Sequence, residues 1–194
     1  MPIPAPTAPA PTAEFYARAM QAAGEALGFS PPTPAETPEA RAAAERLMGH
    51  EVASLETIAA IAALQPASTL VFREASVITG VVATLLLKAE AEPTLRAGEF
   101  DGLEPADAFL GRPSDPVTLY YLWGIAGSTK VGSTSVMQLS RRLRYDVLAD
   151  LTSYALAATP VGRHVGVTQL GFAPVRYEGD ALLVSLPTAR RQAA

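Results

Sequence analysis

The chain of 194 residues contains no cysteine and only two histidines, His50 and His164. Without cysteine it has no disulfide scaffold, no thiolate nucleophile and no zinc site of the cysteine-rich kind. Charged residues make up only 18% of the chain, and the formal net charge is −4. A general nucleic-acid-binding protein is normally strongly basic, so we expect no nucleic-acid partner.

Long apolar runs and targeting signals are also lacking. The longest apolar stretches, residues 77–87 and 119–127, fall well short of the roughly 20 residues that a membrane span needs. The first six residues, Met-Pro-Ile-Pro-Ala-Pro, have neither the basic nor the apolar region of a secretory signal. We therefore expect no membrane association and a cytoplasmic location.

Hydrophobic residues are plentiful, at 49% of the chain, which is enough for one ordinary core. Prolines concentrate near the start of the chain, and their alternation with Ala and Thr in residues 1–12 favours an extended tail. A proline-recognition ligand is the alternative reading of that tail. We divide the rest into a helical extension at 13–67, a folded domain at 68–187 and a frayed tail at 188–194.

Periodicity and turn residues predict the elements in order. We expect helices over 13–27 and 38–64, the second broken at Gly49-His50, and then an antiparallel hairpin of strands 68–75 and 77–87. After a long acidic loop we expect further elements: a strand at 117–126, a helix at 133–151, a strand at 153–158, a helix at 161–170 and strands at 175–177 and 181–186. The predicted fold is α/β (α+β), a mixed and mostly antiparallel sheet flanked by helices.

A Gly/Ser/Thr-rich turn between the strand at 117–126 and the following helix is the most informative segment. A helix N-terminus exposes unpaired amides and a partial positive charge, so it binds phosphate groups. The candidate ligand-binding residues are Gly127, Ser128, Thr129, Lys130, Gly132, Ser133 and Thr134, with Arg141 from a basic cluster that includes Arg142 and Arg144. The alternative is a simple helix cap with solvated arginines. A nucleoside-triphosphate loop is excluded, because Ser133 stands where its lysine must be.

Two segments resemble the GNAT superfamily of N-acyltransferases, which bind acyl-CoA. The stretch Thr129-Lys-Val-Gly-Ser-Thr is similar to the Q/R-x-x-G-x-G/A motif of that family, with Gly132 at its first glycine. The stretch Leu170-Gly171-Phe172, followed by a strand, is similar to the family's C-terminal segment. The resemblance implies acetyl-CoA or another acyl-CoA as substrate and a small-molecule or peptide amine as acceptor.

The resemblance also implies direct acyl transfer, in which an amine attacks the thioester and backbone amides near Ile125–Gly127 hold the oxyanion. Glu74 and His164 are the candidate bases. Val167 stands where many members carry a tyrosine that acts as the general acid for the departing thiolate. Tyr154 is a candidate substitute for that tyrosine. We therefore carry a catalytically inactive GNAT-like binding or regulatory protein as the alternative function, and we leave open that residues 13–64 contact a partner or form a homodimer.

Overall fold

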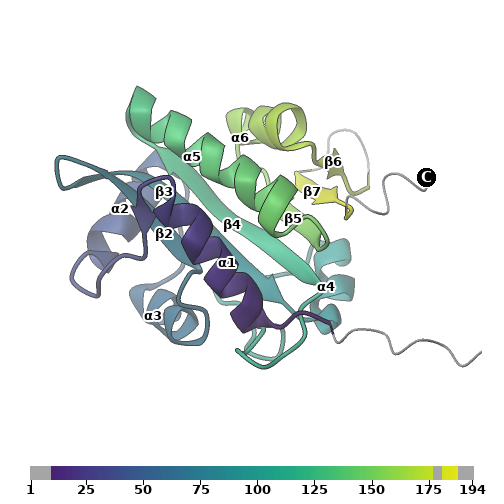
Figure 1. The fold of residues 1–194 in the computed structure, drawn as a ribbon. Helices are drawn as coiled ribbons and strands as arrows, with labels where there is room; N and C mark the ends of the chain where they lie inside the picture. Colours follow the sequence, from purple (N-terminus) through teal and green to yellow (C-terminus); the bar gives the residue numbers. More distant parts are fainter. Residues whose placement is uncertain (1–9, 177–180, 188–194) are drawn as a thin grey trace, which may run out of the picture.

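A computed structural model describes residues 10–176 and 181–187, which form one sheet of seven strands with helices on both faces (Figure 1). The strand order is β1-β2-β3-β4-β5-β7-β6. Every neighbouring pair is antiparallel except β4 and β5, which are parallel. The prediction of a mixed, mostly antiparallel sheet flanked by helices is confirmed.

The element bounds follow the sequence pattern closely. The strands are β1 (Phe29–Ser30), β2 (Thr69–Glu74), β3 (Val77–Leu87), β4 (Leu119–Gly127), β5 (Thr152–Leu156), β6 (Ala173–Pro174) and β7 (Leu182–Ser185). The helices are α1 (Ala13–Glu25), α2 (Thr37–Met48), α3 (Leu55–Leu64), α4 (Glu92–Ala97), α5 (Lys130–Arg142) and α6 (Pro160–His164). Short π-helical turns, Leu143–Val147 and Val165–Gln169, continue α5 and α6.

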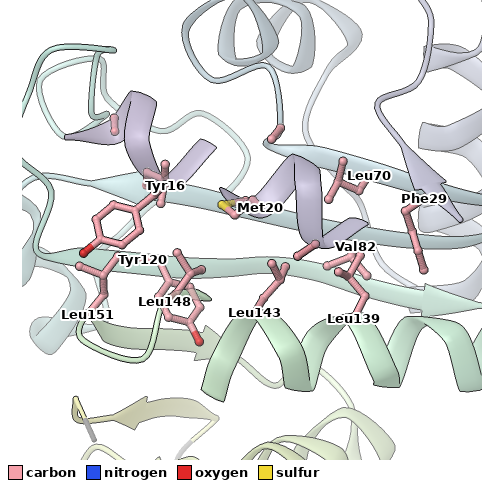
Figure 2. Close-up of a cluster of buried hydrophobic side chains, with 14 of the residues drawn as sticks. Tyr16, Met20, Phe29, Leu70, Val82, Tyr120, Leu139, Leu143, Leu148 and Leu151 are labelled. Carbon is pink, nitrogen blue, oxygen red and sulfur yellow. The ribbon is translucent and has the colours of Figure 1, made fainter. Parts of the chain in front are cut away.

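Helices α1 and α5 cover one face of the sheet. Side chains of α1, including Tyr16 and Met20, pack between the strands and Leu139 of α5, and all three are at most 1% exposed (Figure 2). Each fully buried side chain of this size contributes about 1.5–3 kcal/mol to folding. The first helix therefore belongs to the same core as the strands that follow residue 68.

The second face is covered by α2, α3, α4 and the loop over residues 98–116. Ile61 of α3 and Leu95 of α4 pack against Tyr121 of β4 in a second buried cluster. Because both faces of the sheet are covered, β3 is apolar along almost its whole length instead of alternating.

Strand β4 has two unlike regions. Its first residues, Leu119–Leu122, pair with β3 on one side and with β5 on the other, but pairing with β5 ends at Leu122. At that point the register with β3 also shifts, which leaves Trp123 without a partner in a β-bulge. We call residues 123–127 the open edge of β4, because no residue of β5 pairs with them.

Some predicted boundaries differ from the structure. Helix α5 begins at Lys130, not at residue 133, and the short strand β1 pairs with β2 although the sequence indicates only a connector there. The strand predicted at 175–177 is wrong, because the strand at this place is β6 and ends at Pro174, and residues 175–176 form a bend. Residue 177 lies outside the described residues, as do residues 1–9 and 188–194 of the predicted tails. No helix among the described residues is long and apolar enough to cross a membrane.

Candidate functional site

The open edge lies at the centre of the sheet, where backbone groups are normally paired. Residues 122–125 are nevertheless only half-buried. The Ser128 amide donates to the Thr79 carbonyl of β3, at 2.9 Å. Because amides alternate in direction along a strand, those of Gly127 and Ile125 face the opposite side, toward β5. The open edge therefore presents backbone donors and acceptors to a ligand or to water.

Helix α5 begins directly beyond this edge. Thr129 is its N-cap, with extended backbone angles (φ −119°, ψ 168°), and its hydroxyl oxygen accepts from the Gly132 amide at 2.8 Å. The amides of Lys130 and Val131 belong to the first turn and have no acceptor within the helix. The helix dipole adds partial positive charge at the same place, and no acidic residue lies in the first turn itself.

The glycines of this turn contact the protein's own backbone. A Cβ atom on Gly132 would lie 2.3 Å from the Thr79 carbonyl oxygen, and one on Gly127 would lie 2.7 Å from the Ser133 amide nitrogen. These positions require glycine because α5 sits tightly against β3 and β4. Gly127 and Gly132 were predicted to bind a ligand, but in the structure they allow the N-terminus of α5 to approach the sheet.

The hydroxyl groups of the turn also bond within the chain. Ser133 donates to the Gly127 carbonyl at 3.2 Å, Thr134 to the Lys130 carbonyl at 2.8 Å and Ser128 to the Thr79 carbonyl at 3.4 Å. The sequence predicts that these hydroxyls bind a phosphate. In the structure, the backbone amides of the first turn are the donors that remain for an anion.

Glu74, a candidate base, lies at the end of β2 and accepts a hydrogen bond from the Thr129 hydroxyl. This bond, together with the Thr79 hydroxyl and the Gly132 amide, lowers the pKa of the Glu74 carboxyl. A carboxylate with a lowered pKa is a weak proton acceptor. The structure thus places Glu74 at the α5 N-terminus, where it acts as an anion.

Tyr154, the candidate acid, is completely buried on β5. Its hydroxyl donates to Glu92 Oε1 of α4 at 3.3 Å, and Glu92 in turn pairs with Arg96. Burial is the main cause that raises the pKa of Tyr154, with the nearby Arg96 opposing it. The hydroxyl is therefore engaged by α4, the helix that covers the second face of the sheet.

His164 and Arg141 lie apart from the helix N-terminus. His164 ends α6 with an exposed side chain. Arg141 lies near the C-terminal end of α5, where it bonds to Gln169. At 1.5 Å per residue, it is roughly 16 Å along the helix from Lys130. Arg141 therefore lies far from the turn and contributes no positive charge beside the predicted phosphate site.

Two cavities lie elsewhere in the described part of the chain. One, of about 370 Å³, is lined by Tyr16, Glu92 and Asp150 among others, near the start of β4. The other, of about 260 Å³, lies between α3 and residues 104–110. Neither is lined by residues of the open edge or of α5. Among the described residues, no group of three or more His, Asp or Glu side chains is placed to hold a metal ion.

Two residues of this region, Thr79 and Trp123, were not expected from the sequence. Both lie at β-bulges, where the register with the neighbouring strand shifts. A bulge depends on how two strands separated in the sequence align, and no local pattern marks either residue.

Comparison with known proteins finds no matching family model and no matching curated protein. Among solved structures, the chain is similar to GphF, a GNAT-like decarboxylase in complex with isobutyryl-CoA, at 17% identity and a TM-score of 0.43, covering 70% of this chain and 69% of that one. It is also similar to a GNAT family acetyltransferase from Brucella melitensis in complex with acetyl-CoA, at 14% identity and a TM-score of 0.42, covering 81% of this chain and 86% of that one. These likenesses concern the fold alone, and we base the proposed function on this chain's own residues.

Proposed function

We propose that this chain binds acyl-CoA along the open edge of β4, with the pyrophosphate on the N-terminus of α5. One observation carries the proposal. The strand amides of Ile125 and Gly127, which β5 leaves unpaired, are followed directly by the first-turn amides of Lys130 and Val131. CoA has matching chemistry in the same order, since its pyrophosphate is followed by an extended arm with two amide groups and then by the thioester. An extended chain with amides pairs naturally with an unpaired strand edge.

The reaction that we propose is N-acyl transfer to an amine. The amine nitrogen attacks the thioester carbonyl, a tetrahedral oxyanion forms, and the C–S bond then breaks to release the CoA thiolate. An amide of the open edge is suited to stabilise the oxyanion, because a backbone N–H in a half-buried strand is preorganised. The nitrogen gives up one proton to solvent as the amide forms, and the thiolate takes one up from solvent.

A binding protein without transfer is the second candidate, and the contacts of two candidate catalytic residues favour it. Glu74 accepts from the Thr129 hydroxyl at the helix N-terminus, and the Tyr154 hydroxyl donates to Glu92. Among the described residues, neither side chain forms a hydrogen bond with residues 123–127, and the bonds that each does form hold it away from the open edge.

Calorimetric titration with acetyl-CoA tests binding, and two substitutions of one residue test the site. Lys130→Pro removes the first-turn amide yet suits the helix, because proline is favoured at this position and Thr129 is already extended. Lys130→Ala keeps the amide and removes the charged side chain. We expect about a tenfold loss of acetyl-CoA affinity for Lys130→Pro and about a twofold to threefold loss for Lys130→Ala. No binding by the wild type, or equal losses for the two variants, would contradict the proposal.

Thiol release distinguishes transfer from binding alone. Since the chain has no cysteine, a thiol reagent such as DTNB detects only released CoA and no protein thiol. The assay runs acetyl-CoA against a panel of small amines and lysine peptides. Amine-dependent thiol release supports the transferase, whereas binding without release on any amine supports the binding protein.

A further inference from the structure

The N-terminus of α5 is already occupied by an anion of the protein itself. The Glu74 carboxylate accepts from the hydroxyl of Thr129, the N-cap of α5. Glu74 lies 55 residues earlier in the chain, so the contact joins the β2–β3 hairpin to the helix. An acidic group at this position replaces the acidic first-turn residue that the helix lacks.

A buried hydroxyl beside the same carboxylate belongs to the same anion site. Thr79 is 6% exposed, and its Oγ1 atom has no formed hydrogen bond among the described residues. It lies at the bulge of β3, close enough to Glu74 to help lower the pKa of that carboxyl. A buried hydroxyl without a formed bond is costly, so a ligand oxygen that accepts from it gains affinity.

The Glu74 carboxylate lies next to a strained hairpin turn and has no charged partner in the described part of the chain. The turn residues Ala75 and Ser76 have positive φ angles, 48° and 69°, a conformation that non-glycine residues adopt only at a cost. Glu74 is half-buried and forms no ion pair with a described residue. The carboxylate is therefore held mainly by hydrogen bonds that a phosphate oxygen can take over.

We propose that Glu74 is an internal competitor that must leave the α5 N-terminus before a phosphate group of a ligand binds there. A ligand with a pyrophosphate takes the Thr129 hydroxyl that Glu74 vacates, in addition to the first-turn amides of Lys130 and Val131. Its apparent affinity is reduced by the fraction of molecules in which Glu74 remains docked. The identity of that ligand as CoA rests on the proposed function. The competition itself concerns any phosphate or pyrophosphate.

Substitution of the carboxylate tests the competition. Glu74→Gln keeps the size of the side chain and an acceptor for Thr129, but it removes the charge. The matched control is Glu90→Gln, which makes the same change of net charge at an exposed residue outside the helix N-terminus. The probes are inorganic pyrophosphate and CoA, titrated by calorimetry at fixed ionic strength. We expect Glu74→Gln to bind both probes about tenfold more tightly than the wild type, with Glu90→Gln unchanged.

The two probes separate this proposal from the proposed function. A gain in pyrophosphate affinity supports the competition even if CoA itself does not bind, a result that would count against the proposed function alone. Conversely, if Glu74→Gln binds pyrophosphate no more tightly than the wild type, the competition is wrong even where CoA binds. Glu74→Ala repeats the test, and circular dichroism confirms that each variant is folded.

Discussion

The two regions of β4 differ in what surrounds the same strand. Residues Leu119–Leu122 are paired on both sides and contribute buried side chains to both cores. The open edge is paired on one side only, and polar contacts at the start of α5 lie beyond it. The closed region therefore holds the fold together, while the open region leaves backbone groups available for a ligand.

The largest expected effect is on the free energy of unfolding, when an apolar side chain in each region of β4 is replaced by alanine. Leu119→Ala removes a side chain that is 2% exposed, and we expect it to lower the free energy of unfolding by about 3 kcal/mol. Ile125→Ala removes a half-buried side chain of the open edge, and we expect a loss of about 1–2 kcal/mol. Urea unfolding followed by circular dichroism measures both.

The effects on ligand binding should be reversed. We expect Leu119→Ala to leave the Kd for CoA unchanged in the folded protein. Ile125→Ala should raise it several-fold, because the Ile125 side chain packs against the core and so holds the strand amides in position. If Leu119→Ala weakened binding as much as Ile125→Ala, the division of β4 into a structural and a binding region would be wrong.

A smaller effect concerns pH, because polar contacts fix the hairpin beside the open region. Arg73 of β2 donates to both carboxylate oxygens of Glu36, at 2.8 Å each. These bonds, with others from Thr33, lower the pKa of Glu36 from 4.5 to about 2. A carboxyl whose pKa is lowered by folding stabilises the protein above its unfolded pKa, and this contribution is lost as the pH falls toward the folded value.

We therefore expect Glu36→Gln to be less stable than the wild type at pH 6, with the difference shrinking between about pH 4.5 and about pH 2. Urea unfolding of both proteins at several pH values measures the difference. The loss caused by Leu119→Ala is the control, since an apolar side chain has no proton to bind and its cost should not follow this titration. A Glu36→Gln effect that stays constant down to pH 2 would contradict the ion-pair explanation.

The smallest expected effect is at the far end of α5. Arg141 lies roughly 16 Å from the first turn along the helix, so Arg141→Ala should change the Kd for CoA by less than about twofold. Calorimetry at low salt is the sensitive measurement, because it exaggerates surface electrostatics. A tenfold loss would show that the ligand reaches along α5 and that the sequence prediction for this residue was right.

Local signals in the sequence predicted most of the fold. Ser54 caps α3, and its hydroxyl accepts from the Thr57 amide at 3.0 Å. Such a cap is a local signal, because it involves residues only three apart. Strand β3 was predicted with the bounds that the structure shows, since its apolar run ends at clear boundaries. Strand β1 was missed, because two residues are too few to carry a pattern.

The candidate site was predicted less completely. The turn before α5 was identified, but its helix was predicted to begin only after Gly132, because glycine is unfavourable within a helix. The structure includes Gly132 in the helix, because only glycine fits against the Thr79 carbonyl. The position of Glu74 at the helix N-terminus depends on a hairpin that is distant in sequence, so no spacing in the chain indicates it. The roles of the individual site residues stay predictions.

Trp123 has a further consequence. It is the sole tryptophan of the chain, it lies at the bulge where β4 and β5 part, and its indole nitrogen donates to the Gly102 carbonyl at 2.6 Å. Indole emission from the whole protein therefore originates at one position next to the open edge. The molecule contains its own optical reporter, and ligand arrival at this edge can be followed without attaching a dye.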